Sequence, residues 1–287
     1  MNTRSDLARP AGEAFQTRVE RDFVEASGPD AEKFLQGQLS QDVAGLAVGA
    51  SAYSLLLQPQ GKIEAWLRVT RLSADSYLLD VEGGWGEAVL ARLNRFKLRT
   101  KCELVRLDGW HCWAVRGGEP SSVGDGGTIV ADVGWPGVGG FDRLGIGLEP
   151  LENIPVVGTD RYVAARVGAG VPALGAELDD HTIPAEAGQW LIDRSVSFTK
   201  GCYTGQELVA RIDSRGSNTP RKLRLITATE GLEVGASVVV DGVEVGIVTS
   251  ANVGGSEALA YCKRAVEPPV SATVGTAEAR VQVLPEG

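Results

Sequence analysis

The stretch Lys200-Gly-Cys-Tyr-Thr-Gly-Gln-Glu207 places a cysteine between glycines, just ahead of an apolar periodic segment. Thr204 and Glu207 have the S/T-x-x-E spacing of a capping box, which predicts that Thr204 is the N-cap of a helix. Gly201 and Gly205 permit a positive φ or a close packing contact. We therefore expect a tight loop that leads directly into a helix, with an apolar face formed by Leu208, Val209 and Ile212.

In this arrangement Cys202 would face unpaired backbone N–H groups and the positive end of the helix dipole. Lys200 and Arg211 are close in sequence, and both effects favour a thiolate. Cys202 is therefore the predicted catalytic residue. The alternative is a buried, inert cysteine beside an ordinary helix, because free cysteine usually fills protein cores.

The composition indicates a soluble globular protein. A chain of 287 residues is long enough for two or three domains, and its apolar (43%) and charged (23%) fractions are ordinary. The net charge of −9 argues against wrapping nucleic acid through a general positive field. Basic runs at 92–101 and 211–224 are interpreted as solvated faces or, alternatively, as a site for a small polyanion.

The cysteine and histidine content argues against metal sites and disulfides. The four cysteines are scattered without a CxxC pair, and only two histidines are present. No apolar run reaches the length of a membrane span, and the N-terminus lacks a signal-peptide pattern. These features predict a cytoplasmic protein without a metal centre.

Hydrophobic periodicity predicts an α+β first part. A helix is expected to begin near Ser27–Asp30, with Pro29 at an early helical position. Strands and helices then follow with short connections, which suggests a small sheet carrying its helices on one face. The expected strands are 52–57, 63–69, 76–81 and 102–107, and the expected helices are 85–96, 159–167 (with Thr159 as cap) and 185–192.

The two ends of the chain have different patterns. Residues 1–12 are expected to be a disordered lead. From residue 217 onward, short apolar runs of even spacing alternate with turn signals such as Asp241-Gly242, which predicts a small closed or nearly closed barrel. Its expected strands are 222–228, 237–240, 244–249, 258–262, 270–274 and 278–283.

Over Lys200–Gly216 (KGCYTGQELVARIDSRG), the chain resembles the YgfZ-type folate-binding proteins. These proteins are related to the T protein of the glycine cleavage system, a tetrahydrofolate-dependent aminomethyltransferase. The K-G-C-[FY]-x-G-Q-E element is typical of the YgfZ branch. The resemblance covers nearly the whole chain after residue 15 and includes segments 34–43, 60–63, 166–172, 183–188, 245–250 and 258–262.

The resemblance implies an α+β fold of three domains around a central folate-binding hole. A discontinuous central α+β domain would comprise 1–47 and 111–216. A small, ferredoxin-like α+β domain would be inserted at 48–110, and 217–287 would form the C-terminal β-barrel domain. The resemblance also favours a monomer.

The resemblance further suggests which residues hold tetrahydrofolate or a one-carbon derivative. Glu186 matches the carboxylate that grips the pterin ring in the T protein, because one carboxylate can accept both an amino group and a ring N–H. Alternatively, Glu186 is only a surface helix charge. Asp80 is a second polar candidate, and the predicted cofactor-binding set also contains Trp66, Lys200, Tyr203 and Arg211.

One departure from the T protein concerns its reaction. The T protein has paired aspartates shortly after the turn that corresponds to Gly61, and here those positions are Ala65 and Trp66. Neither side chain can transfer a proton. Glu64 is adjacent, but on an alternating strand it points to the opposite face from Ala65. Trp66 is expected either to stack on a flat ligand or to be a core residue.

These observations favour a tetrahydrofolate-binding protein that acts in iron–sulfur protein assembly or repair through Cys202, with iron–sulfur proteins as its clients. No set of cluster-binding cysteines is present, so the chain is not expected to carry a cluster itself. The alternatives are a folate-dependent aminomethyl or one-carbon transferase, and a scaffold that has lost folate. A Cys–His nucleophile enzyme is a further alternative, although neither His111 nor His181 lies in a motif that orients it toward Cys202.

Overall fold

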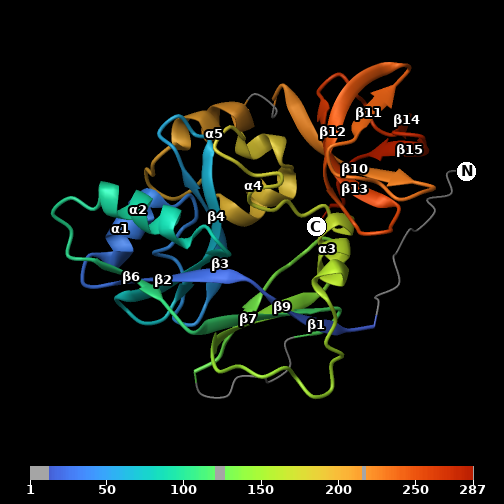
Figure 1. Ribbon diagram of the computed structural model, residues 1–287. Helices are drawn as coiled ribbons and strands as arrows, with labels where there is room; N and C mark the ends of the chain where they lie inside the picture. The colour runs from blue at the N-terminus through green and yellow to red at the C-terminus, as the bar shows by residue number, and fades with distance from the viewer. Residues whose placement is uncertain (1–12, 120–126, 215–217, 287) are drawn as a thin grey trace, which may run out of the picture.

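The computed structural model describes residues 13–119, 127–214 and 218–286. It contains two antiparallel sheets and a closed barrel, with the helices placed around them (Figure 1). The α+β fold ending in a small barrel, expected from the sequence, is confirmed. The expectation of a disordered lead at 1–12 lies outside the described residues.

The first sheet has the order β3-β4-β5-β2-β6. Its strands are β2 (Arg21–Ser27), β3 (Ser51–Leu57), β4 (Ile63–Arg71), β5 (Ser76–Glu82) and β6 (Glu103–Leu107). Helices α1 (Ala31–Gln38) and α2 (Gly86–Phe96) pack against it through buried residues such as Leu35 and Leu93. The predicted domain boundary at residue 47 cuts across this sheet, because β2 pairs with both β5 and β6. Pro29 precedes α1, so its predicted place inside the helix is wrong.

The second sheet has the order β1-β7-β9-β8. Its strands are β1 (Phe15–Val19), β7 (Trp110–Arg116), β8 (Ile129–Asp132) and β9 (Gly140–Ile146). Helix α3 (Thr159–Gly168) contacts β1 at one end and the barrel strands at the other. Its N-cap is Gly158, so Thr159 is the first helical residue rather than the expected cap.

The helix expected at 185–192 is divided into two elements. A 3₁₀ turn, η1 (Pro184–Glu186), is followed by α4 (Gln189–Ser195). Gly188 lies between them with φ +110°, a conformation that an α-helix cannot contain. The last helix is α5 (Gln206–Ser214).

The C-terminal barrel closes in the order β10-β13-β12-β11-β14-β15. Its strands are β10 (Arg221–Ala228), β11 (Ser237–Val240), β12 (Val243–Ala251), β13 (Glu257–Lys263), β14 (Val270–Val274) and β15 (Ala277–Gln282). Asp241 and Gly242 both have positive φ, as a two-residue hairpin turn requires. Small and β-branched residues such as Val238, Ala260 and Val281 fill the interior.

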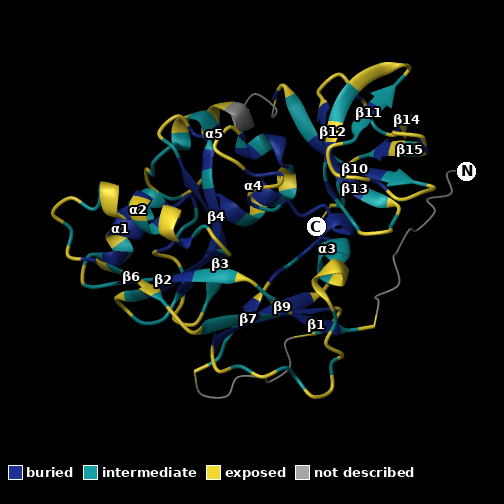
Figure 2. Ribbon diagram, viewed as in Figure 1, coloured by how far each residue is buried: buried dark blue, intermediate teal, exposed yellow. Residues whose placement is uncertain are grey.

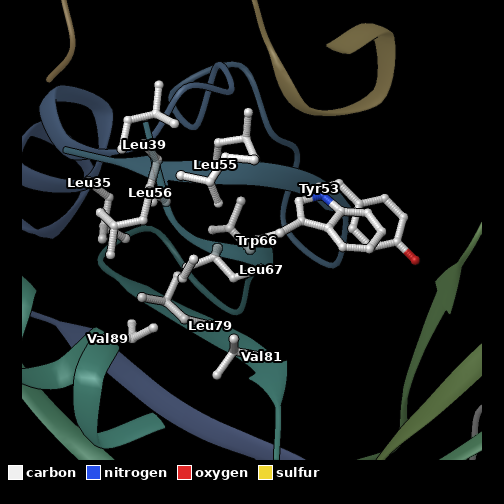
Figure 3. Close-up of a cluster of buried hydrophobic side chains, with 14 of the residues drawn as sticks. Leu35, Leu39, Tyr53, Leu55, Leu56, Trp66, Leu67, Leu79, Val81 and Val89 are labelled. Atoms are coloured by element: carbon white, nitrogen blue, oxygen red, sulfur yellow. The ribbon is translucent and has the colours of Figure 1, made fainter. Parts of the chain in front are cut away.

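The largest hydrophobic cluster lies between the first sheet and its neighbouring helices. Buried positions follow β4, β9 and the inner side of α4, whereas exposed positions lie on loops and outer helix faces (Figure 2). Strand β4 is buried on both faces: Ala65 and Leu67 face one way, and Trp66 and Arg68 the other. In Figure 3, Tyr53 and Trp66 overlap at the edge of the leucine-rich cluster.

Candidate functional site

Lys200 fixes the loop that carries Cys202. Its Nζ atom donates hydrogen bonds to the carbonyl oxygens of Gln36 (2.6 Å), Leu39 (2.7 Å) and Gln41 (2.8 Å), which lie at the end of α1 and just beyond it. Desolvation lowers the pKa of Lys200 to about 8, while the nearby Asp42 opposes this shift. All three N–H donors are used within the protein. The structure therefore gives Lys200 a structural role in this loop, and its contact with folate stays a prediction.

Glycines bring the same loop against the turn that precedes β4. Gly61 (φ +79°) and Gly205 (φ +84°) face each other so closely that a Cβ on Gly205 would lie 2.6 Å from the carbonyl oxygen of Gln58. A Cβ on Gly61 would lie 2.5 Å from the Leu208 Cβ atom. The expected conformational need at Gly205 is confirmed. At Gly201 it is wrong, because a Cβ there would meet no atom within 4 Å and its φ is not positive.

The predicted capping box at Thr204 is not formed. Helix α5 begins at Gln206, because Gly205 has a left-handed backbone conformation that separates Thr204 from the helix. Instead, the Thr204 N–H donates to the carbonyl oxygen of Gly37 at 3.1 Å. The Gln206 side chain accepts a hydrogen bond from the Tyr203 N–H at 3.1 Å. Side-chain and backbone contacts from α1 thus determine the path of the loop.

Cys202 is exposed, whereas Cys102, Cys112 and Cys262 are buried. This excludes the alternative of a buried, inert thiol. Helix α5 begins four residues after Cys202, and Lys200 points its ammonium group at α1, so the two predicted sources of thiolate stabilisation are not in place. Arg211 forms an exposed ion pair with Glu207 (3.7 Å). The structure shows that the Cys202 side chain is exposed and lies on a loop that the hydrogen bonds of Lys200 hold in place.

A buried network of guanidinium and carboxylate groups connects the two sheets. Asp80 accepts from Arg21 (2.5 Å) and Arg68 (3.0 Å), Arg68 also donates to Asp142 (2.9 Å), and Arg116 donates to Asp142 (2.8 Å). Desolvation opposes ionisation of Asp142, but the attraction of Arg116 and Arg68 outweighs it and lowers the pKa of Asp142 to about 2. Asp80 is fully buried in this network and has a structural role there, and its contact with folate stays a prediction.

Beside this network lies a small cavity with aromatic walls, here called the aromatic cavity. Trp66 stacks on Tyr53 with ring centroids 4.7 Å apart, and Trp135 lies 5.3 Å from Tyr162. The free volume is about 20 Å³, enough for roughly one water molecule. The lining residues are Arg21, Tyr53, Trp66, Leu67, Glu82, Arg116, Trp135, Asp142, Tyr162, Arg166, Val171 and Pro172.

Two polar atoms of this wall are buried without a hydrogen-bond partner among the described residues. They are Nε of Arg116 and Nε1 of Trp135, both N–H donors. A buried donor without an acceptor costs about 1–3 kcal/mol. Glu82 supplies an acceptor on the same wall: its carboxylate accepts from the Leu174 N–H at 2.5 Å, and desolvation raises its pKa. The residues that line the aromatic cavity therefore include two with an unpartnered donor, one carboxyl group and several aromatic rings.

A second, larger cavity of about 580 Å³ lies between α4, β10 and the segment 284–286, and is here called the basic cavity. Three cations line it, namely Arg194, Lys222 and Arg224. Glu186 also lines it, but is only 3% exposed and lies in the 3₁₀ turn, so it is not a surface helix charge. Its Oε2 atom accepts from Arg221 Nε (3.0 Å) and from the Ile183 N–H (3.4 Å).

The two cavities share a wall. Gly134 lines the basic cavity and Trp135 lines the aromatic cavity, and the same holds for Gly170 and Val171. Trp190 lines the basic cavity and meets Trp66 edge to face, with centroids 6.0 Å apart. The wall therefore contains residues from α4, from the end of α3 and from the loop after β8.

The predicted site residues are thus only partly brought together. Trp66 is a core residue and also a cavity wall, with Nε1 donating to Ser195 Oγ at 3.0 Å. Tyr203 and Arg211 line neither cavity. Sequence analysis missed Glu82, Arg116, Trp135 and Tyr162, because neither cavity is formed by a single motif.

The positions of the missing T-protein aspartates provide no acid to the aromatic cavity. Ala65 is buried, and Glu64 forms an ion pair with Arg92 of α2 at 2.6 Å, so it faces the helices. A register shift between β3 and β4 occurs next to Glu64. Among the described residues, no group of three or more metal-binding side chains comes together. Within the same residues, no helix is long and apolar enough to cross a membrane.

Comparison with known proteins agrees with this architecture. Residues 21–123 match the family model of the GCVT N-terminal domain. Aminomethyltransferase T of the glycine cleavage system from Bartonella henselae superposes with a TM-score of 0.76 over 95% of this chain and 86% of that structure, at 20% sequence identity. The fold is therefore that of an aminomethyltransferase T.

Sequence relatives narrow the assignment. An uncharacterized protein from Haemophilus influenzae is 31% identical over 71% of this chain and 70% of its own length. The mitochondrial iron–sulfur cluster assembly factor IBA57 homolog of Cryptococcus neoformans is 32% identical, over 71% of this chain and 63% of its own length. The tRNA-modifying protein YgfZ of Edwardsiella ictaluri is 25% identical, over 68% and 65%. The chain therefore resembles members of the glycine cleavage T-protein family, and relatives named YgfZ are among its matches, in agreement with the resemblance to YgfZ-type proteins found in the sequence.

Proposed function

We propose that this protein binds a tetrahydrofolate derivative in the aromatic cavity and acts in iron–sulfur protein assembly or repair through Cys202. The relatives named as iron–sulfur cluster assembly factors support the process. The observation that carries the folate proposal is the pair of unpartnered donors, Arg116 Nε and Trp135 Nε1, in an aromatic-walled cavity.

The residues present fit a pterin in their chemistry. A pterin is flat and carries acceptor atoms beside an amino group, so it can stack between the rings, accept from the two free donors and donate to Glu82. The free volume of about 20 Å³ is smaller than a pterin, so binding requires the side chains that line the cavity to move apart. Glu186 remains a proposed contact through its Oε1 atom, because Oε2 is already held by Arg221.

The residues at the positions of the T-protein aspartates favour folate binding without catalytic turnover. A reduced folate supplies a one-carbon group on its N5 or N10 atom. An aminomethyl transfer needs a positioned acid or base, whereas Ala65 and Trp66 have none and Glu64 is paired with Arg92. We therefore assign folate the role of a bound ligand and Cys202 the role of the reactive group. Turnover of an aminomethyl donor with free tetrahydrofolate would favour the transferase instead.

Cys202 is suited to contact another protein, because it is exposed on a loop that Lys200 fixes through three hydrogen bonds. Two relatives are named as tRNA-modifying proteins. With a net charge of −9, we propose a protein client rather than direct contact with RNA.

The folate site is tested with Trp135→Phe, which removes the Nε1 donor and keeps a ring. Tetrahydrofolate should bind about fivefold more weakly, because one hydrogen bond contributes about 1 kcal/mol. The matched control is Trp113→Phe, since Trp113 Nε1 donates to the Leu148 carbonyl outside the cavity. Equal affinity of wild type and Trp135→Phe would remove this donor from the site.

The role of Cys202 is tested with Cys202→Ser in cells that lack their own copy of the protein. Iron–sulfur enzyme activities should stay low with Cys202→Ser and recover with the wild type. Cys102→Ser is the control, because Cys102 is buried. Full recovery with Cys202→Ser would contradict the proposed role.

A further inference from the structure

The end of α2 and the loop after it form a cationic surface on an acidic protein. No aspartate or glutamate occurs between Glu87 and Glu103, although the chain has 37 acidic residues and a net charge of −9. Within the part of the chain that the structure describes, the cations that follow Arg92 in this stretch form no ion pair. They are Arg95, Lys97, Arg99 and Lys101, of which only Lys97 is partly buried.

Stabilisation of α2 explains only part of this charge. Arg95 lies in the last turn of the helix, where a cation interacts favourably with the helix dipole. Arg99 and Lys101 lie beyond the helix, where that effect has faded. Arg99 also has φ +56°, a left-handed conformation that costs a residue other than glycine roughly 1–2 kcal/mol. An arginine in a conformation that favours glycine indicates that its side chain has a use outside the fold.

An exposed leucine lies among these cations. Leu98 is 80% exposed, the highest fraction among the large apolar side chains that the structure describes. Its N–H donates to the carbonyl oxygen of Phe96 at 3.0 Å, and the Phe96 ring lies 3.7 Å from the guanidinium carbon of Arg92. The leucine is therefore presented on a held backbone. An apolar side chain between cations is typical of a protein contact with a small apolar centre and a charged rim.

The exposed face of α1 begins beside this loop. The Asp30 side chain accepts a hydrogen bond from the Lys101 N–H at 2.8 Å, and the Asp30 N–H donates to the Lys101 carbonyl oxygen at 3.2 Å. Lys33 and Gly37 follow Asp30 at spacings of three and four residues, so all three lie on one side of the helix. Lys33 is exposed and adds a further cation to the same surface.

The Cys202 loop lies at the other end of this face. The Thr204 N–H donates to the Gly37 carbonyl oxygen at 3.1 Å, and Cys202 is exposed two residues earlier. A helix rises about 10 Å over the seven residues from 30 to 37, so one partner molecule can span the cations and the thiol. A Cβ on Gly37 would meet no atom within 4 Å, which leaves the surface between them open. Helices α1 and α2 lie on the side of the molecule away from the barrel (Figure 1).

We propose that this cationic strip binds an acidic face of the protein client and thereby places the client at Cys202. The strip is defined by Lys33, Arg95, Lys97, Leu98, Arg99 and Lys101. This inference rests on the proposed function, because it assumes that Cys202 acts on another protein.

Two other anionic partners fit the strip less well. Single-stranded nucleic acid is bound by aromatic side chains on which the bases stack, whereas the exposed apolar residue here is Leu98. A membrane surface is bound through a large apolar helix face beside the cations, whereas one leucine provides a small apolar area. An acidic protein surface needs only the rim of cations and one apolar contact.

The first experiment reverses charges of the strip in cells that lack their own copy of the protein. The triple variant Arg95→Glu, Arg99→Glu, Lys101→Glu should restore iron–sulfur enzyme activities about fivefold less than the wild type, because like charges then repel the client. Its urea midpoint and its affinity for 5-formyltetrahydrofolate should equal those of the wild type, since none of the three residues lines a cavity. The control has the same net charge and reverses exposed cations of β1, α3 and β15, in Arg18→Glu, Arg161→Glu, Arg280→Glu.

The control should restore the activities as the wild type does. If the triple variant of the strip does so too, while Cys202→Ser does not, the inference is wrong and the proposed function stands. Equal activities with the wild type, Cys202→Ser and the triple variant would overturn the two together.

The second experiment identifies the occupant of the strip. The photo-cross-linker p-benzoylphenylalanine is placed in the full-length chain at Leu98 and, separately, at Gly201, where a side chain meets no other atom. Both positions should form an adduct with the same iron–sulfur protein, identified by mass spectrometry, and the adduct from Leu98 should disappear in the triple variant. Val253, which is 76% exposed between β12 and β13, is the control position and should not give this adduct.

Three results of the second experiment would contradict the proposed occupant. Adducts with RNA, adducts with different proteins at the two positions, or an adduct from Gly201 alone would each overturn the inference. Flotation of the wild type, but not of the triple variant, with phosphatidylglycerol vesicles at physiological salt would assign the strip to a membrane surface and overturn it as well.

Discussion

Replacing Lys200 by methionine tests whether this lysine fixes the Cys202 loop. The substitution keeps most of the apolar stem and removes the three hydrogen bonds to Gln36, Leu39 and Gln41. A hydrogen bond from a charged donor stabilises by about 1.5–3 kcal/mol, so the low end of this range gives about 4.5 kcal/mol for three bonds. Water can rehydrate part of this half-buried site, which leaves an expected loss of about 2–3 kcal/mol.

Two measurements on Lys200→Met test this expectation. Urea denaturation should show the lower free energy of unfolding. Hydrogen exchange should become faster in 197–204 and at the end of α1, because the two segments are no longer held together. Lys33→Met is the matched control, since Lys33 is exposed on the same helix and should change stability by less than about 0.5 kcal/mol. A loss below 0.5 kcal/mol in Lys200→Met, with unchanged exchange, would refute the assigned role.

Three other predictions concern the cysteine, the ion network and the pterin site. Cys202 should react with a thiol reagent at neutral pH faster than any other cysteine, because the remaining three are buried and burial raises the pKa of Cys262 to about 11; equal labelling rates would contradict this. Asp142→Asn should destabilise the protein by about 3–5 kcal/mol at pH 6, because it leaves Arg68 and Arg116 buried without a full partner. The pKa of Asp142 is lowered from 3.8 to about 2, so the stabilisation by its carboxylate is present above pH 4 and is lost as the pH falls toward 2. The difference in the free energy of unfolding between wild type and Asp142→Asn should therefore become smaller as the pH is lowered. A difference that stays constant would contradict the ion pairs. Glu82→Gln should weaken tetrahydrofolate binding by about 1.5 kcal/mol and more than Glu186→Gln does, because Arg221 already holds Glu186; the reverse order, measured by calorimetry, would return the pterin to Glu186.

Local sequence patterns predicted the elements that depend on near neighbours. The strands of the barrel follow from short apolar runs and from the Asp241-Gly242 turn, whose positive φ angles those residue types tolerate. Strands β3 to β6 and helix α2 were located by periodicity to within about two residues. In each case the deciding contacts lie within a few residues along the chain.

Other features depend on contacts that no local pattern encodes. The capping box at Thr204 had the right spacing, but Gly205 turns the backbone before the helix begins. Strand β2 joins the first sheet through β5 and β6, which lie more than 45 residues further along the chain. Whether Lys200 would contact a ligand or the end of α1 depends on how segments 160 residues apart pack together.

The residues of the candidate site were likewise predicted only in part from the sequence. Trp66 was predicted as a possible stacking residue, and it does lie in the wall of the aromatic cavity. Arg116 and Trp135 could not be found, because their importance comes from donors that packing leaves without an acceptor. Such unpartnered atoms become visible only when the second sheet, α3 and β4 are placed together.

The central claim, that this chain binds a reduced folate, is tested most directly by calorimetric titration of the purified, reduced protein with tetrahydrofolate and its 5-formyl derivative. The account predicts one binding site of micromolar affinity, with binding that persists although Ala65 and Trp66 replace the T-protein aspartates. The absence of binding heat and of any thermal stabilisation with both ligands would contradict it, and would leave Cys202 and its protein client as the functional part of the molecule.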